Sequence, residues 1–110
     1  MTRASPGGYA GQALIVDVAG PTATVLALDD QVLRAYLGGV GLGAWLLHRL
    51  APPGVDPLTP QAPLAFVFSP LVGTPLTTSA KFAVVAKSPE MGRLTDALAS
   101  SQYAISGKLT

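Results

Sequence analysis

Apolar residues alternate with other residues near the start of the chain, which predicts a β-hairpin. Across residues 12–18, every second position from Leu14 onward is apolar, so one face of an extended strand is apolar. A Gly-Pro turn at 19–22 separates this stretch from residues 23–28, which are rich in residues that favour strands. The two stretches are therefore expected to pair antiparallel.

The spacing of apolar residues becomes helical after the hairpin. Either Asp29 or Asp30 can cap a first helix, because a short carboxylate accepts hydrogen bonds from the free N–H groups of the first turn. The Gly38-Gly39 pair is expected to end this helix, since glycine tolerates the left-handed conformation. A second helix is predicted over residues 41–50, where apolar residues recur at i, i+3, i+4 and i+8.

The second half of the chain is predicted to contain three strands and a last helix. Their expected ranges are 64–68, 81–87 and 93–98 for the strands and 99–108 for the helix. A proline-rich connection covers 51–63, and a loop of Gly, Pro and Thr covers 69–80. Antiparallel hairpins around two successive helices predict the α+β class rather than a doubly wound parallel sheet.

The composition excludes several kinds of site. The chain has no cysteine and a single histidine, His48, so it has no disulfide, no cysteine-ligated zinc or iron–sulfur centre and no multi-histidine metal site. A net charge of +1 does not suggest nucleic acid binding. No residue is a convincing general acid, general base or metal ligand. We therefore assign no catalytic and no metal-binding residue.

The sequence indicates neither a signal peptide nor a membrane span. The N-terminus lacks the apolar run of a signal peptide. The uncharged stretch at 57–80 contains five prolines, which prevent a spanning helix. We therefore expect a cytoplasmic protein that has neither a membrane nor a nucleic acid as partner.

Two segments have more than one interpretation. The glycine cluster at 37–43 follows a helix rather than a strand, so close helix–helix packing is favoured over nucleotide binding.

The loop at 69–80 is rich in hydroxyl groups and precedes a strand with a lysine at each end. Such a loop can hold a polar ligand with a lysine as the cation. On composition alone, an ordinary strand flanked by solubilising lysines is favoured.

Short motifs lie in order along nearly the whole chain, at 9–18, 36–47, 52–58, 70–74 and 84–89. One of them is a glycine-rich helix pair that reads YLGGVGLGA, and the most characteristic block reads VVAKSP. Together these motifs resemble the N-terminal domain of the tungsten-containing aldehyde ferredoxin oxidoreductase family. The resemblance covers only the first part of that domain, about half of it. It implies that residues 9–110 are a partial domain of this family, preceded by a disordered tail at 1–8.

The resemblance implies a platform for a bis-molybdopterin cofactor that holds tungsten, or sometimes molybdenum. Enzymes of the family oxidise aldehydes to carboxylates and pass electrons through a [4Fe–4S] cluster to ferredoxin. The cluster cysteines are expected in downstream domains, beyond Thr110, and these domains are the expected partners of the chain. Ferredoxin would be reached through the full enzyme. A family strand that would follow is missing, so one sheet edge is expected to be unpaired.

The resemblance also assigns candidate cofactor contacts. Lys81 occupies the position of a family arginine that contacts the pterin, which keeps the cation but not the planar bidentate fork. Leu98 falls where the family has an asparagine that contacts the pterin, and Val40 falls at an arginine of the glycine-rich turn. Lys81 is expected to pair with a pterin or phosphate oxygen. Thr95, Leu98 and Ser100 are expected to line the same face through backbone groups.

Two functions remain open from the sequence. The first is an N-terminal fragment or split subunit of an aldehyde ferredoxin oxidoreductase-like enzyme, which supplies part of the cofactor platform and is not catalytic alone. The second is a stand-alone interaction domain that kept the fold and lost the cofactor. Val40, Lys81 and Leu98 favour the second function, because each replaces a polar family group with a less specific one.

Overall fold

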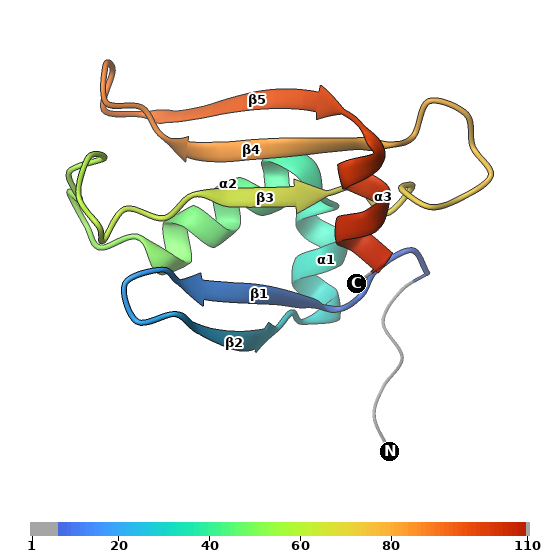
Figure 1. Cartoon of the computed structure of the whole chain (residues 1–110), viewed down its shortest axis with the longest axis horizontal. Coiled ribbons are helices and arrows are strands. Elements are labelled where there is room, and N and C mark those ends of the chain that lie inside the picture. The colour runs from blue at the N-terminus through green and yellow to red at the C-terminus, as the bar shows by residue number, and fades with distance from the viewer. Residues whose placement is uncertain (1–6, 110) are drawn as a thin grey trace.

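The computed structural model describes residues 7–109, which form two antiparallel sheets and three helices (Figure 1). The strands are β1 (Gln12–Asp17), β2 (Thr22–Ala27), β3 (Ala65–Phe68), β4 (Lys81–Lys87) and β5 (Leu94–Ser100), and the helices are α1 (Asp30–Tyr36), α2 (Gly39–Leu50) and α3 (Gln102–Leu109). One sheet pairs β1 with β2, and the other has the order β3-β4-β5. The predicted α+β class is confirmed. Residues 1–6 of the expected N-terminal tail lie outside the described residues.

The largest difference from the predicted ranges lies between β5 and α3. The sequence predicted a helix from Ala99, but β5 continues to Ser100 and α3 begins at Gln102. Ala99 and Ser100 stay extended because they pair with Phe82 and Lys81 of β4. Pairing with a neighbouring strand therefore outweighs the local preference for a helix.

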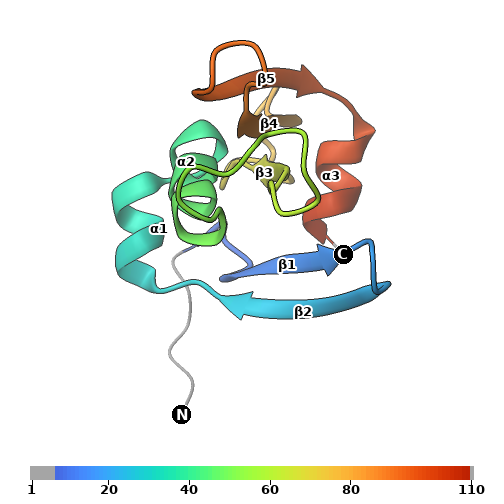
Figure 2. The same cartoon turned by 90° about the vertical axis from the view of Figure 1, so that its left-hand side faces the viewer.

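The three-stranded sheet lies between α2 and α3 (Figures 1 and 2). Helix α2 packs on β3 and β4 from one side, whereas α3 covers only one end of the opposite face. The contact between α3 and this face is made by Tyr103, whose ring centroid lies 5.0 Å from that of Phe82. Phe66, on the same face, remains 48% exposed. Within residues 7–109, no helix has the length and apolar character that crossing a membrane requires.

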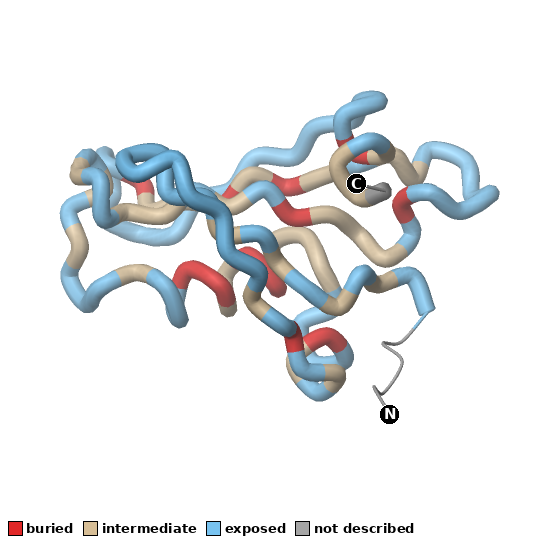
Figure 3. The backbone as a smooth tube through the Cα atoms, turned by 60° about the horizontal axis from the view of Figure 1, so that its bottom comes forward, coloured by how far each residue is buried: buried red, intermediate tan, exposed pale blue. Residues whose placement is uncertain are grey.

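The main core forms where the hairpin, α1 and α2 meet the inner face of the sheet. Its buried residues are Leu28, Leu33, Leu42, Leu46 and Val67. The hairpin contributes Ala13 and Leu26 to this core. On the other face of the hairpin, Leu14 and Val25 are exposed. Figure 3 shows the same contrast, with buried segments in α1, α2 and the inner strands and exposed backbone along the hairpin and β5.

The glycine cluster brings α2 close to its neighbours. A Cβ atom on Gly43 would lie 2.6 Å from Val85 Cγ2, and one on Gly38 would lie 2.9 Å from the Phe68 carbonyl oxygen. Gly41 approaches the end of α1 at a similar distance. No side chain fits at these separations without a shift of its neighbours. The cluster thus serves close packing, but the predicted helix–helix contact is made by Gly41, whereas Gly43 and Gly38 pack against the sheet side of the molecule.

Helix α1 ends on a strained residue rather than on the glycine pair. Its start is regular, because the Asp29 carboxylate accepts a hydrogen bond from the Gln31 N–H at 2.9 Å. At its end, Leu37 adopts φ 66° and ψ −68°, and the Gly38 N–H donates to the Tyr36 carbonyl oxygen at 2.8 Å. This arrangement is a γ-turn centred on a residue with a side chain, which costs about 1–2 kcal/mol.

Replacing Leu37 by glycine is expected to stabilise the chain by about 1 kcal/mol, because glycine adopts this conformation without steric strain. Little apolar burial is lost, since Leu37 is 62% exposed. Urea unfolding measures the change. Leu58→Gly is the control, because Leu58 is also exposed and has an ordinary negative φ. Equal losses of stability in the two variants would contradict the assignment of strain to Leu37.

Candidate functional site

Lys81 and Ser100 meet at one end of the three-stranded sheet, where β4 begins and β5 ends. The two residues are partners in the strand register, and Lys81 Nζ donates a hydrogen bond to Ser100 Oγ at 2.8 Å. Together with Thr78, Ala80 and Ser101 they line a shallow, open pocket of about 350 Å³. We call it the Lys81 pocket.

The N-terminus of α3 borders the Lys81 pocket. Ser101 caps this helix: its Oγ accepts a hydrogen bond from the Tyr103 N–H at 3.1 Å, and its carbonyl accepts one from Ala104 at 3.1 Å. A helix N-terminus carries a partial positive charge, which adds to that of the Lys81 ammonium. An ammonium, hydroxyl groups and a helix N-terminus together suit the oxygen atoms of an anion or a polarised carbonyl.

Lys108 holds the loop that leads into the Lys81 pocket. Its Nζ donates to the carbonyl oxygens of Ser69, Pro70 and Val72 at 3.0, 2.8 and 2.7 Å. Burial lowers the pKa of Lys108 from its ordinary value. We call these three hydrogen bonds the Lys108 clamp. The clamp ties the start of the 69–80 loop to α3, and the end of the same loop lines the pocket.

The structure brings together two of the four residues expected to contact a cofactor, Lys81 and Ser100. Leu98 lies on the same face of β5 as Ser100, but it is 69% exposed and does not line the pocket. Thr95 lies near the other end of β5, paired with Ala86. Side chains alternate along a strand, so the Thr95 side chain points to the opposite face from Leu98 and Ser100.

The backbone hydrogen bonds also distinguish Thr95 from Leu98 and Ser100. Just beyond the two ends of the β4–β5 ladder, the Ser88 N–H donates to the Arg93 carbonyl and the Ser101 N–H donates to the Ala80 carbonyl. Bonded positions alternate in an antiparallel pair, so the odd-numbered residues of β5, including Thr95, are bonded to β4. The even-numbered residues, at positions 94, 96, 98 and 100, direct their N–H and C=O groups away from the sheet.

Sequence reasoning did not assign two residues that shape this region. Ser101 carried a signal that was available, since a serine directly before a helix is a common N-cap. Lys108 carried none, because the carbonyls that it contacts lie 36 to 39 residues earlier in the chain. Local patterns do not report contacts at that separation.

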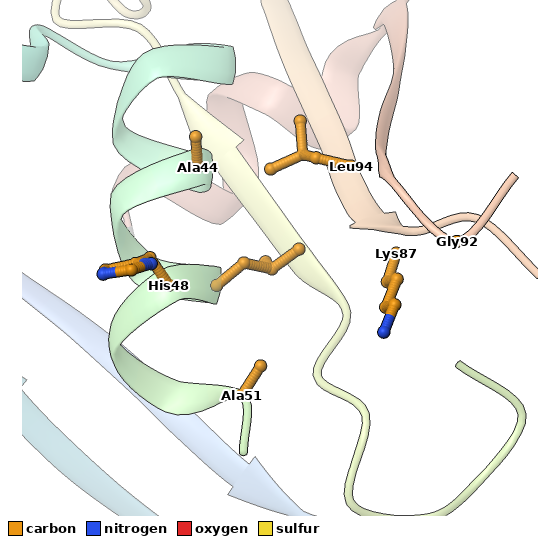
Figure 4. Close-up of a pocket in the computed structure, with 7 residues that line it drawn as sticks. Ala44, His48, Ala51, Lys87, Gly92 and Leu94 are labelled. Carbon is orange, nitrogen blue, oxygen red and sulfur yellow. The ribbon is translucent and has the colours of Figure 1, made fainter. Parts of the chain in front are cut away.

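A second depression, of about 420 Å³, lies near the opposite end of the sheet (Figure 4). It is lined by Ala44, Leu47, His48 and Ala51 from α2 and by Lys87, Gly92 and Leu94 from the region where β4 turns into β5. Lys87 Nζ donates to the Val55 carbonyl oxygen at 2.6 Å. Two of its lining side chains, His48 and Lys87, carry hydrogen-bonding nitrogen atoms, whereas four lining side chains of the Lys81 pocket carry a nitrogen or a hydroxyl group.

Metal ligands are not part of the Lys81 pocket. Among residues 7–109, no group of three or more His, Cys, Asp or Glu side chains is placed to hold a metal ion. The pocket instead offers nitrogen and hydroxyl donors, which suit the oxygen atoms at the periphery of an organic cofactor.

The chain belongs to the aldehyde ferredoxin oxidoreductase family: the N-terminal domain of that family matches residues 13–109. This confirms the family that the sequence motifs indicated. Members of this family are oxidoreductases, and the curated relatives include tungsten-containing enzymes.

Three relatives illustrate the similarity. The tungsten-containing aldehyde ferredoxin oxidoreductase of Pyrococcus horikoshii is 32% identical over 85 residues, which cover 77% of this chain and 14% of the relative. The corresponding enzyme of Pyrococcus furiosus is 39% identical over 67 residues, which cover 61% of this chain and 11% of the relative. The aliphatic sulfonate oxidoreductase, WOR-like subunit, of Pyrococcus furiosus is 30% identical over 100 residues, which cover 88% of this chain and 16% of the relative. The chain thus spans a small part of each relative's length.

A solved structure shares the fold. The active site complex BamBC of benzoyl coenzyme A reductase, in complex with 1,5-dienoyl-CoA, matches with a TM-score of 0.77 and 31% identity. The match covers 83% of this chain and 14% of that chain. The fold described above therefore occurs as a small part of a much longer polypeptide.

Proposed function

We propose that the chain supplies part of the cofactor platform of an aldehyde ferredoxin oxidoreductase-like enzyme. Lys81 and Ser100 would contact an oxygen atom of a bis-molybdopterin cofactor that carries tungsten or molybdenum. The supporting observation is the Lys81–Ser100 hydrogen bond of 2.8 Å in a pocket beside the N-terminus of α3. When bound, the cofactor supplies the redox centre for oxidation of an aldehyde to a carboxylate.

A platform role fits the relatives better than a substrate-specific role. Their names refer to different substrates, namely aldehydes, aliphatic sulfonates and benzoyl coenzyme A. A segment common to enzymes with such different substrates is suited to a task that they share. The residues that line the pocket provide hydrogen bonds and one positive charge, and none of them is a carboxylate or a histidine that could transfer a proton to or from a substrate.

The remaining parts of the reaction are assigned to the downstream region of the same enzyme. This chain covers 14% of the Pyrococcus horikoshii relative. The downstream region would supply the [4Fe–4S] cluster, most of the pterin contacts and the surface for ferredoxin. The chain itself would bind and orient one edge of the cofactor and would not be catalytic alone.

Lys81→Ala is expected to lower the tungsten or molybdenum retained by the assembled enzyme about tenfold, because a charge-assisted hydrogen bond is lost. The chain is co-expressed with the downstream region of the Pyrococcus horikoshii relative, and bound metal is measured by mass spectrometry after purification. Lys81→Arg is expected to retain the metal, since arginine keeps the cation and adds a second donor.

Arg93→Ala is the matched control for loss of charge, because Arg93 is exposed and does not line the Lys81 pocket. Unchanged metal retention in Lys81→Ala would refute the assignment of Lys81. If neither the wild-type assembly nor Lys81→Arg retains metal, the result favours the other function considered, an interaction domain that has lost the cofactor.

A further inference from the structure

The 69–80 loop connects β3 to β4 and extends beyond the end of the sheet, next to α3 (Figure 1). Its residues 73–78 are exposed. The hydrogen bonds that these residues make join neighbours along the chain. Thr74, for example, donates to the Leu71 carbonyl oxygen through its N–H at 3.2 Å and through its hydroxyl at 2.6 Å. The rest of the fold therefore holds this part of the loop through its two ends.

Lys108 attaches the start of the loop to a helix that is itself fixed. A Cβ atom on Gly107 would lie 2.5 Å from Phe68 Cζ, and Ala104 is fully buried, so α3 packs closely on its neighbours. Next to Gly107, Lys108 makes the three hydrogen bonds of the Lys108 clamp. A lysine ammonium carries three N–H donors, so each carbonyl oxygen of the clamp has one donor.

The other end of the loop forms one wall of the Lys81 pocket. Thr78 and Ala80 line the pocket, and the Ala80 carbonyl oxygen accepts a hydrogen bond from the Ser101 N–H at 3.1 Å. Thr78 has φ 59°, in the left-handed region that is unfavourable for a residue with a side chain. A strained residue of this kind persists only where the surrounding structure holds it. The shape of this wall therefore depends on how the loop is anchored.

We propose that Lys108 is a positioning residue of the Lys81 pocket. It fixes residues 69–72 to α3 and thereby holds residues 73–79 in the path that brings Thr78 to the pocket and Lys81 to its place opposite Ser100. Lys108 acts through the loop, because it does not line the pocket itself. This inference rests on the proposed function, since the ligand that the positioned pocket serves is the cofactor assigned to Lys81.

Lys108→Met is expected to shift the amide resonances of Thr78 and Lys81 in nuclear magnetic resonance spectra of the full chain, because the loop loses its attachment to α3. Gly43→Val is the matched control for lost stability. A Cβ atom on Gly43 would lie 2.6 Å from Val85 Cγ2, and neither residue lines the Lys81 pocket. The control is expected to leave both resonances in place at a temperature where the two variants are folded.

Unchanged Thr78 and Lys81 resonances in Lys108→Met, or equal shifts in the two variants, would overturn the proposal. If Lys108→Met does not fold, Lys108→Gln takes its place. Glutamine keeps two N–H donors but is uncharged and places its nitrogen one bond closer to the backbone. It is expected to shift the same two resonances, and unchanged resonances there would overturn the proposal as well.

Metal retention gives a second measurement, with the chain co-expressed with the downstream region of the Pyrococcus horikoshii relative as before. Lys108→Met is expected to lower the retained tungsten or molybdenum about tenfold, as is usual for residues that orient a ligand contact. Combined with Lys81→Ala, the loss is expected to stay at about tenfold and not to reach about a hundredfold, because both changes remove the same contact. Multiplied losses in the double variant would overturn the proposal.

The two measurements separate this proposal from the platform function. The amide resonances are recorded on the chain without cofactor, so they test the positioning by Lys108 even if the assembled enzyme holds no metal. Loss of metal in Lys81→Ala with full retention in Lys108→Met would support the platform function and overturn the positioning role. Shifted resonances with unchanged retention in Lys81→Ala would support the positioning role and refute the assignment of Lys81 to the cofactor.

Discussion

A Gly43→Val chain is expected to lose about 3 kcal/mol of its free energy of unfolding. The reason is the contact between α2 and the sheet, where even a Cβ atom on Gly43 would lie 2.6 Å from Val85 Cγ2 and 3.3 Å from Val67 Cγ2. Val85 is fully buried and Val67 is 5% exposed, so neither side chain has free space into which it can move. Accommodating valine requires α2 to shift away from the sheet.

Urea unfolding followed by circular dichroism measures this loss. Gly20→Ala serves as the control, because a Cβ atom on Gly20 would have no neighbour within 4 Å. The control is expected to unfold at nearly the wild-type midpoint. If Gly43→Val unfolded at that midpoint as well, α2 would not pack on the sheet through Gly43.

Lys108→Met is expected to destabilise the chain by about 3 kcal/mol, because three carbonyl oxygens lose a charged donor at once. Methionine keeps most of the aliphatic length, so the effect reports the hydrogen bonds more than the packing. The carbonyls belong to Ser69, Pro70 and Val72, and Val72 is 2% exposed. Part of the loss appears as faster amide exchange in the 69–80 loop.

The control for this substitution is Lys81→Met, which removes a lysine that makes one hydrogen bond at an exposed position. Its effect on stability is expected to stay below about 1 kcal/mol. Thermal unfolding of both variants provides the comparison. Equal effects would show that the clamp contributes no more than an ordinary surface lysine does.

The predicted helices and strands agree best with the structure where the pattern of apolar and polar side chains is strong. The range 81–87 matches β4 at both ends, because apolar residues alternate there between two lysines. The helix end at Leu37 was not foreseen, since the pattern pointed to the glycine pair, and a positive φ at leucine is stable only in a folded chain. The start of α3 was placed early because the pairing of Ala99 with Phe82 is a tertiary contact.

The candidate site was predictable in part. The resemblance to the family pointed to Lys81 as the cation and to Ser100 as a neighbour, but the distance between them depends on the register of β4 and β5. That register is set by the turn between the strands, and it also decides that Thr95 faces the other side. Without the register, odd and even positions of β5 cannot be assigned to the two faces of the sheet.

The Lys108 clamp has a consequence for the response of the protein to its ionic surroundings. Three converging carbonyls are the kind of oxygen cage in which a dissolved cation would otherwise sit. Here the positive charge is covalently attached, so its effective concentration at the cage is set by the chain and not by the solution. Exchanging sodium for potassium at constant ionic strength should therefore leave the 69–80 loop unchanged.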